Sequence, residues 1–169
     1  HSFPTRRSSD LMKMSQQYLN KELLEQLQAD FPAIVEIFGE SAPYQIIVNP
    51  KNILEVLEYL KNNKQFDFSM LNNLTAVDYK EYLEIVYHLY SYDKKHMAIV
   101  KVRLSKEKPS IESVVPIWQT ADFQEREVFD LFGIWFKNHP NMKRILLPED
   151  FVGHPLLKDF QMLNGEKRG

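Results

Sequence analysis

The spacing of apolar residues along the chain predicts two helices separated by a hairpin. A first helix is predicted over Ser15–Ala29, because its leucines recur on one face of a 3.6-residue period. Two short β-rich runs follow over Ile34–Phe38 and Tyr44–Val48, and the Gly- and Pro-containing loop between them indicates a hairpin. The second helix is predicted over residues 49–63, because Asn49 is a favoured N-cap and Pro50 suits the first helical position.

The middle of the chain is rich in residues that favour strands. Three longer runs, Leu71–Tyr79, Leu83–Tyr92 and Met97–Leu104, are predicted to form a meander in which the short link before Met97 is a second hairpin. In the run Met97–Leu104 one set of alternate residues is apolar and the other is mixed. This alternation is typical of a sheet with one covered face. A further strand is predicted over Ser110–Ile117.

The last third of the chain changes character after a short predicted helix. That helix spans Phe123–Phe132, with Asp122 as its expected N-cap and Gly133 just past its end. From Ile134 onward, prolines and glycines are spaced among aromatic and basic residues, and the apolar residues have no helix or strand period. We therefore expect an α+β fold with a mixed or antiparallel sheet and helices packed on one face, followed by an extended, irregular C-terminal arm.

The length of 169 residues is that of one domain. Residues 1–11 look like a translated sequencing adapter, so we expect a non-native leader and a start at Met12 or Met14; a native polar leader is the alternative. The α+β domain is then expected over residues 12–133 and the arm over residues 134–169.

Composition excludes several kinds of binding site and chemistry. The formal net charge is −2, and Lys143, Arg144 and Lys158 in the arm are too few and too mixed with acids to form a nucleic-acid stripe. The chain contains no cysteine, which excludes disulfides, thiolate ligands for zinc or iron–sulfur clusters, and a thiol nucleophile. Any part that this chain takes in redox chemistry is therefore played without a thiolate-held cluster of its own.

Charged residues crowd the last predicted helix. Glu125 and Glu127 stand two positions apart, so their side chains point in different directions on a helix. Arg126 and Asp130 have the i, i+4 spacing of an ion pair. Acids near a helix start together with one ion pair explain this pattern without catalysis. A free-standing acid–base enzyme built on Glu125, Glu127 and His139 is the alternative.

The histidines lack the spacing of a metal site. His139 and His154 are fifteen residues apart, and each precedes a proline, which favours extended or turn backbone. Neither has a second His or a Cys at ligand spacing. The acids that could complete a site with them are Glu149, Asp150 and Asp159. We expect no bound metal.

The segment from Glu125 to Leu147 is similar to the signature of the C subunit of respiratory complex I, the thirty-kilodalton-type subunit of proton-pumping NADH:quinone oxidoreductase. The positions that match this family pattern are Glu125, Arg126, Glu127, Asp130, Leu131, Phe132, His139, Lys143, Ile145 and Leu146. The run Pro148–Phe160 also resembles the family. Leu157 and Gln161 depart from it, where Arg and Pro are usual.

The resemblance implies a structural subunit with no catalytic site, cofactor or metal of its own. It implies that FMN, iron–sulfur clusters, NADH and quinone are used in other subunits of the complex. The implied partners are the D subunit of complex I and the cluster-bearing B and I subunits. The residues implied in the family signature and partner interface are Glu125, Arg126, Glu127, Asp130, Gly133, His139, Pro140, Lys143, Arg144, Gly153, His154, Pro155, Lys158 and Asp159.

The same resemblance implies a place and a process. The chain would lie peripherally on the cytoplasmic face of the bacterial inner membrane and support electron transfer from NADH to quinone, coupled to proton translocation. An equivalent subunit of an ion-pumping membrane hydrogenase complex is the alternative, because such subunits carry much of the same signature.

Overall fold

The computed structural model describes residues 17–161. The expected leader, the start at Met12 or Met14 and the last residues of the arm lie outside the described residues. The helices and strands follow the chain in the order α2 (Lys21–Asp30), β1 (Val35–Phe38), β2 (Gln45–Val48), the 3₁₀ turn η1 (Pro50–Asn52), α3 (Ile53–Asn62), β3 (Met70–Asp78), β4 (Tyr82–Ser91), β5 (His96–Ser105), β6 (Ser110–Glu112), α4 (Ala121–Phe132) and β7 (Trp135–Lys137).

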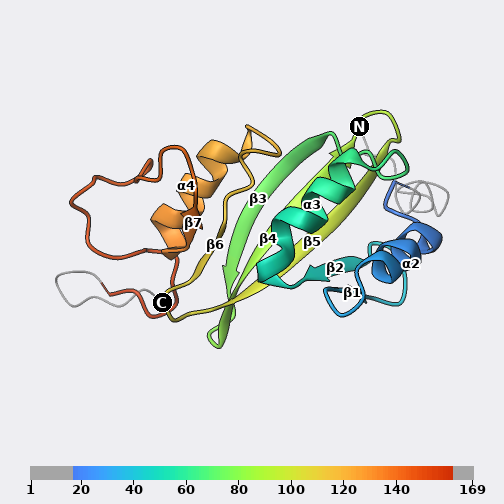
Figure 1. The fold of residues 1–169 in the computed structure, drawn as a ribbon. Helices are drawn as coiled ribbons and strands as arrows, with labels where there is room; N and C mark the ends of the chain where they lie inside the picture. Colours follow the sequence, from blue (N-terminus) through green and yellow to red (C-terminus); the bar gives the residue numbers. More distant parts are fainter. Residues whose placement is uncertain (1–16, 162–169) are drawn as a thin grey trace, which may run out of the picture.

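The main sheet has five strands in the order β1-β2-β5-β4-β3. β2 and β5 pair in parallel, while the other neighbours pair antiparallel. Figure 1 shows α3 lying across one face of this sheet, and its buried residues Ile53, Val56, Leu57 and Leu60 join the core. The expected α+β fold with a mixed sheet and helices packed on one face is confirmed. α4 contacts β3, the strand at the edge of the sheet.

The first helix is shorter than expected. It begins at Lys21 rather than at Ser15, because the Asn20 side chain accepts the N–H of Leu23 at 2.9 Å and caps the helix there. Just before it, the Leu19 N–H donates to the Met97 carbonyl at 3.1 Å. These residues therefore extend the sheet rather than the helix.

Two further expectations about the region before α4 are wrong. The strand predicted over Ser110–Ile117 ends at Glu112, because the N–H groups of Ile117 and Trp118 turn back to the carbonyl of Val114. Asp122 is not the N-cap, since α4 begins at Ala121 and Asp122 lies in its first turn.

The arm is not irregular from its beginning. Trp135–Lys137 forms β7, which pairs in parallel with β6 as a separate two-stranded sheet. Ile134 and Phe136 are fully buried in the core. A three-residue strand is too short to show a period, which explains why the sequence does not reveal it. The irregular part that follows, residues 138–161, is called the anchored segment below.

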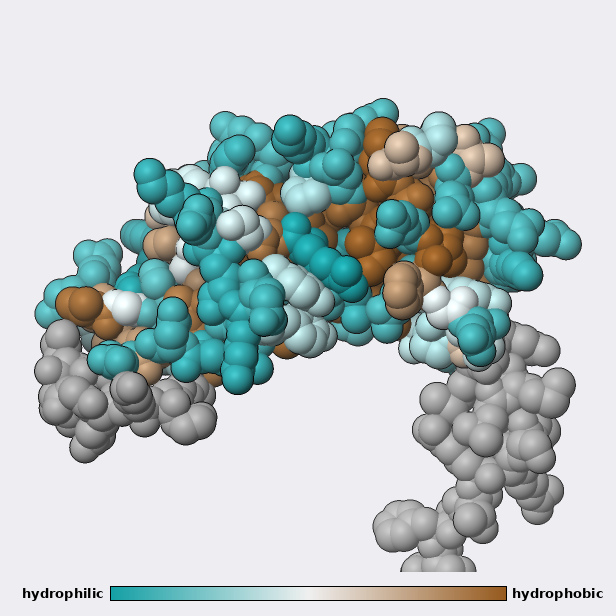
Figure 2. Space-filling model, turned by 90° about the horizontal axis from the view of Figure 1, so that it is seen from below, coloured by the Kyte–Doolittle hydropathy of each residue, from teal (hydrophilic) through white to brown (hydrophobic). Residues whose placement is uncertain are grey.

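The surface carries apolar side chains as well as polar ones. On the face seen in Figure 2, apolar side chains gather towards the middle among hydrophilic ones. None of the helices within residues 17–161 has the length and hydrophobicity needed to cross a membrane. The large exposed apolar residues are Phe38, Met70, Val77, Tyr79, Tyr92, Phe123, Trp135, Leu146, Val152 and Leu156.

Candidate functional site: helix α4 and the anchored segment

Asp130 is the main contact between α4 and the anchored segment. Its side chain is fully buried, and its Oδ1 accepts a hydrogen bond from Nη1 of Arg144 at 2.6 Å. Its Oδ2 accepts the backbone N–H groups of residues 145, 146 and 147 at 3.2, 2.8 and 2.8 Å. One carboxylate therefore fixes the path of four consecutive residues, 144–147.

This environment keeps Asp130 ionised. Burial raises the pKa of the Asp130 carboxyl, but the hydrogen bonds from Leu147, Leu146 and Arg144 outweigh burial and hold the pKa below its ordinary value. A charged carboxylate with this many donors is a strong structural contact, because charge-assisted hydrogen bonds are stronger than neutral ones.

Two arginines also hold the anchored segment to α4, but their partners differ from those that the i, i+4 spacing predicts. Arg144 also donates to the carbonyl of Gly153 at 2.6 Å, and its guanidinium lies 5.5 Å from the ring centroid of Phe151. Arg126 donates to the carbonyls of Lys143 and Arg144 at 3.0 and 3.1 Å. The expected ion pair between Arg126 and Asp130 is therefore wrong. Arg144 takes the carboxylate, which leaves Arg126 to hold the backbone of the anchored segment.

Gly133 closes α4 in a left-handed conformation with φ of 76°, as expected for a residue at the helix end. A Cβ atom at this position would lie 2.7 Å from Cδ2 of His154. The His154 ring is held there because its Nδ1 lies 2.9 Å from the carbonyl oxygen of Asp130. Both the backbone angle and the neighbouring ring therefore require glycine.

We expect Gly133→Ala to lower the free energy of unfolding by about 2 kcal/mol or more. A left-handed backbone costs a non-glycine residue about 1–2 kcal/mol, and the contact with His154 adds to this. Urea denaturation measures the loss. In the Gly133→Ala background, His154→Ala should recover part of the stability by removing the clashing ring. Strict additivity of the two substitutions would contradict the proposed contact.

Asp78 holds the far end of the anchored segment. This buried residue at the end of β3 accepts the N–H of Lys158 at 2.9 Å and pairs with Nζ of Lys106 at 3.0 Å. Burial raises the pKa of Asp78, but the hydrogen bonds from Lys158, Lys80 and Lys106 lower it by more, so the pKa lies below its ordinary value. Asp78 is not among the residues predicted from the sequence. Its local pattern shows only a turn residue, which it also is, since Oδ1 accepts the Lys80 N–H.

Glu125 holds α4 to residues 113 and 114, which follow β6. It is fully buried and accepts the Ser113 hydroxyl at 2.6 Å and the Val114 N–H at 2.8 Å. Burial, with a smaller contribution from Asp122, raises the pKa of Glu125 to about 7 against the opposing effect of the two hydrogen bonds. Burial also raises the pKa of Tyr87, and the negative charge of Glu125 adds to that rise.

His139 connects the start of α4 to the anchored segment. Its Nδ1 accepts the N–H of Asn141 at 2.9 Å, and its Nε2 is hydrogen-bonded to the backbone carbonyl of Asp122 at 3.1 Å and lies 3.0 Å from Oδ1 of the same residue. Its Nε2 lies 4.0 Å from Oε1 of Glu125. Glu127 is exposed whereas Glu125 is buried. The three residues of the acid–base alternative therefore do not face one substrate.

The possible metal-binding set of histidines and acids is not assembled. His139 and His154 contact different parts of α4, and within residues 17–161 no three His, Cys, Asp or Glu residues are grouped to hold a metal ion. Leu157, which replaces the usual Arg of the family, packs against the core. The other expected interface residues lie at the surface or are half-buried: Pro140, Lys143, Pro155, Lys158 and Asp159.

Gly153 takes a left-handed backbone with φ of 97°, and a Cβ atom there would lie 2.9 Å from the ring of Phe160. This glycine therefore lets two parts of the anchored segment pack closely, and its carbonyl is the one bound by Arg144.

Known proteins share this arrangement of sequence and fold. Residues 46–166 match the family described as the 30 Kd subunit of respiratory-chain NADH dehydrogenase. The C subunit of NADH-quinone oxidoreductase from Moorella thermoacetica is 43% identical over 141 residues, which is 82% of this chain and 93% of the relative. The C subunit of F(420)H(2) dehydrogenase from Methanosarcina mazei is 40% identical over 146 residues, covering 83% of this chain and 91% of the relative.

A solved structure supports the same assignment. A chain of the membrane-bound sulfane sulfur reductase, an archaeal respiratory membrane complex, is similar with a TM-score of 0.72 and 27% identity over 85% of this chain and 86% of that chain. The two relatives are subunits of an NADH-quinone oxidoreductase and an F(420)H(2) dehydrogenase, and the solved chain belongs to a respiratory membrane complex. The chain therefore belongs to the family of the thirty-kilodalton subunit of respiratory-chain NADH dehydrogenase, which is the C-subunit family of complex I.

Proposed function

We propose that this chain is a non-catalytic structural subunit of a complex I-type oxidoreductase and that the anchored segment is its docking surface for the D subunit. In this role it supports electron transfer from NADH to quinone coupled to proton translocation. The observation that carries the proposal is the two-sided character of the anchored segment. Its backbone is fixed to α4 by Asp130, while apolar side chains project outward from the same stretch.

The exposed side chains are suited to an interface. Leu146 and Val152 are 56% and 62% exposed, and Leu156 and Trp135 are also exposed nearby. Apolar side chains next to arginine are typical of the centre of a protein–protein interface. Because the backbone is already fixed in the free chain, less conformational entropy is lost when a partner binds.

Family membership supports the remaining features of the proposal. The chain holds no cofactor or metal, and FMN, iron–sulfur clusters, NADH and quinone belong to other subunits. The B and I subunits are the proposed cluster-bearing neighbours. The complex places the chain peripherally at the cytoplasmic face of a bacterial inner membrane.

A different electron input is the second candidate function. The Methanosarcina relative is a subunit of an F(420)H(2) dehydrogenase, and the similar solved chain belongs to a sulfane sulfur reductase. An ion-pumping hydrogenase complex belongs to the same class of alternatives. Assays of the purified complex with NADH, reduced F420 and hydrogen as electron donors distinguish these inputs.

We expect the triple substitution of Leu146, Val152 and Leu156 by serine to abolish co-purification with the D subunit while leaving the melting temperature of the isolated chain nearly unchanged. All three side chains are exposed, so their replacement removes interface area and little core packing. Substitution is a sharper test than deleting the segment, because deletion leaves buried Asp130 without Arg144.

The matched control replaces three exposed apolar residues elsewhere by serine: Phe38, Val77 and Tyr92. This control should retain the D subunit. If the triple variant of the anchored segment binds the D subunit as well as the unmodified chain does, the segment is not the docking surface.

A further inference from the structure

The outer edge of β3 is open near its beginning. β3 is the last strand of the five-stranded sheet, so one side of its backbone has no neighbouring strand. Two contacts cross this edge. The indole Nε1 of Trp118 donates to the Phe68 carbonyl at 3.1 Å, and the Gln124 side chain of α4 accepts the Leu74 N–H. Between these contacts, no hydrogen bond joins the described residues 69–73 to the segment 116–120.

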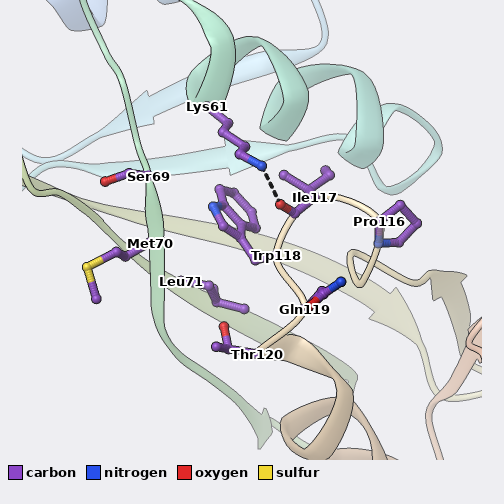
Figure 3. Close-up of a pocket in the computed structure, with 9 residues that line it drawn as sticks. All are labelled: Lys61, Ser69, Met70, Leu71, Pro116, Ile117, Trp118, Gln119 and Thr120. Carbon is purple, nitrogen blue, oxygen red and sulfur yellow. Dashed lines mark hydrogen bonds between the residues drawn. The ribbon is translucent and has the colours of Figure 1, made fainter.

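A cavity of about 430 Å³ lies along this open stretch. Figure 3 shows it between β3 and the segment that precedes α4, with Trp118 between the two and Met70 pointing away. Leu71 and Trp118 supply apolar surface, while Gln119 and Thr120, which follow Trp118 on the same segment, are exposed polar residues. The volume lies within the range of about 300–1,000 Å³ that is usual for binding pockets.

Lys61 gives the cavity a positive charge. Its Nζ donates to the carbonyl of Ile117 at 2.7 Å (Figure 3). Among residues 17–161, no carboxylate forms an ion pair with it. Because an ammonium group has three donors, two remain for a ligand. The chemistry that complements this corner of the cavity is a carboxylate.

We propose that an extended segment of a neighbouring subunit occupies this cavity, hydrogen-bonds to the edge of β3 and places an Asp or Glu carboxylate on Lys61. A polypeptide fits better than a small molecule, because the free side of a strand presents alternating backbone donors and acceptors that pair with extended chain. The six-residue step from Phe68 to Leu74 spans about 20 Å, enough for a short added strand. This inference rests on the proposed membership of a multi-subunit complex.

Photocrosslinking tests the proposal, and the absence of cysteine makes a single attachment site possible. Gln119→Cys is labelled with a benzophenone maleimide, and the chain is assembled into the complex and purified from membranes. We expect a crosslink to one neighbouring subunit, at a peptide that contains Asp or Glu. Lys61→Met should lower the crosslink yield about fivefold, the effect of losing one partly exposed ion pair. Lys61→Arg should restore it.

Lys64→Met is the matched control, because Lys64 is an exposed lysine just beyond the end of α3, the helix that carries Lys61. It should leave the yield unchanged. A melting curve of each isolated variant separates loss of binding from loss of folding. The proposal is overturned if the label crosslinks within its own chain or to a second copy, or if it gives no crosslink in the assembled complex. If the chain does not co-purify with any membrane complex, the proposed function itself fails.

Discussion

Replacing Asp130 by alanine is expected to lower the free energy of unfolding by about 3–5 kcal/mol, the usual cost of removing one partner of a buried ion pair. Arg144 would keep its charge in a site where its side chain is only 11% exposed. The N–H groups of residues 145–147 would lose their acceptor as well. For a chain of this length the loss corresponds to a decrease in Tm of about 10 °C.

Calorimetry or urea denaturation at neutral pH measures this effect. Asp150→Ala is the matched control, because Asp150 is an exposed acid in the same anchored segment, and it should change stability by less than about 0.5 kcal/mol. Limited proteolysis should cut the anchored segment faster in Asp130→Ala than in the control. Equal stability of the two variants would show that Asp130 does not hold the segment.

Asp130→Ala should also weaken binding of the D subunit, since the exposed apolar side chains would lose their fixed positions.

Glu125 should make the unmodified chain less stable as the pH rises from about 4.5 to about 7. Its pKa is raised from 4.5 to about 7 in the folded chain, so over this range the unfolded chain releases a proton that the folded chain retains. The stabilising effect of the protonated side chain is complete below pH 4.5 and is lost once the pH exceeds the folded-state pKa. The difference amounts to about 3 kcal/mol.

Glu125→Gln is the informative variant, because an amide keeps the shape of the protonated acid and cannot ionise. The stability difference between this variant and the unmodified chain should shift in favour of the variant by about 3 kcal/mol between pH 4.5 and pH 8. Asp78 and Asp130 have lowered pKa values, so their ionised carboxylates stabilise the fold, and this stabilisation is lost as the pH falls below the ordinary pKa of an aspartate. Their effects are common to both chains and cancel in the comparison. A difference that is independent of pH would refute the assignment.

The regular elements of this protein could be predicted from local patterns. Strand-favouring residues over β4 and β5, with alternation in β5, predict two long neighbouring strands, and the structure pairs Tyr82–Ser91 with His96–Ser105. Asn49 and Pro50 mark the start of the second helical stretch, where the Asn49 side chain accepts the Lys51 N–H at 3.1 Å. These features depend on residues that are close in sequence, so the residues themselves carry the information.

The short elements could not be predicted in this way. The strand β7 is three residues long, and its parallel partner β6 lies on the other side of α4 in the chain. The first helix begins late because Asn20 caps it and the residues before it bind to Met97. The Asn20 cap is a local contact, but the pairing of β7 with β6 and the hydrogen bond from Leu19 to Met97 involve distant segments, which no local period records.

The sequence by itself determined the family, because the charged and apolar residues of the signature from Glu125 to Leu146 stand at a characteristic spacing. Only the tertiary structure decided which of them meet. Asp130 pairs with Arg144, fourteen residues away, instead of with Arg126. Asp78 binds the backbone of Lys158, eighty residues away. The anchored segment has no periodic pattern, so its path follows from buried carboxylates that must find hydrogen-bond donors, and those donors are identified only once the chain is folded.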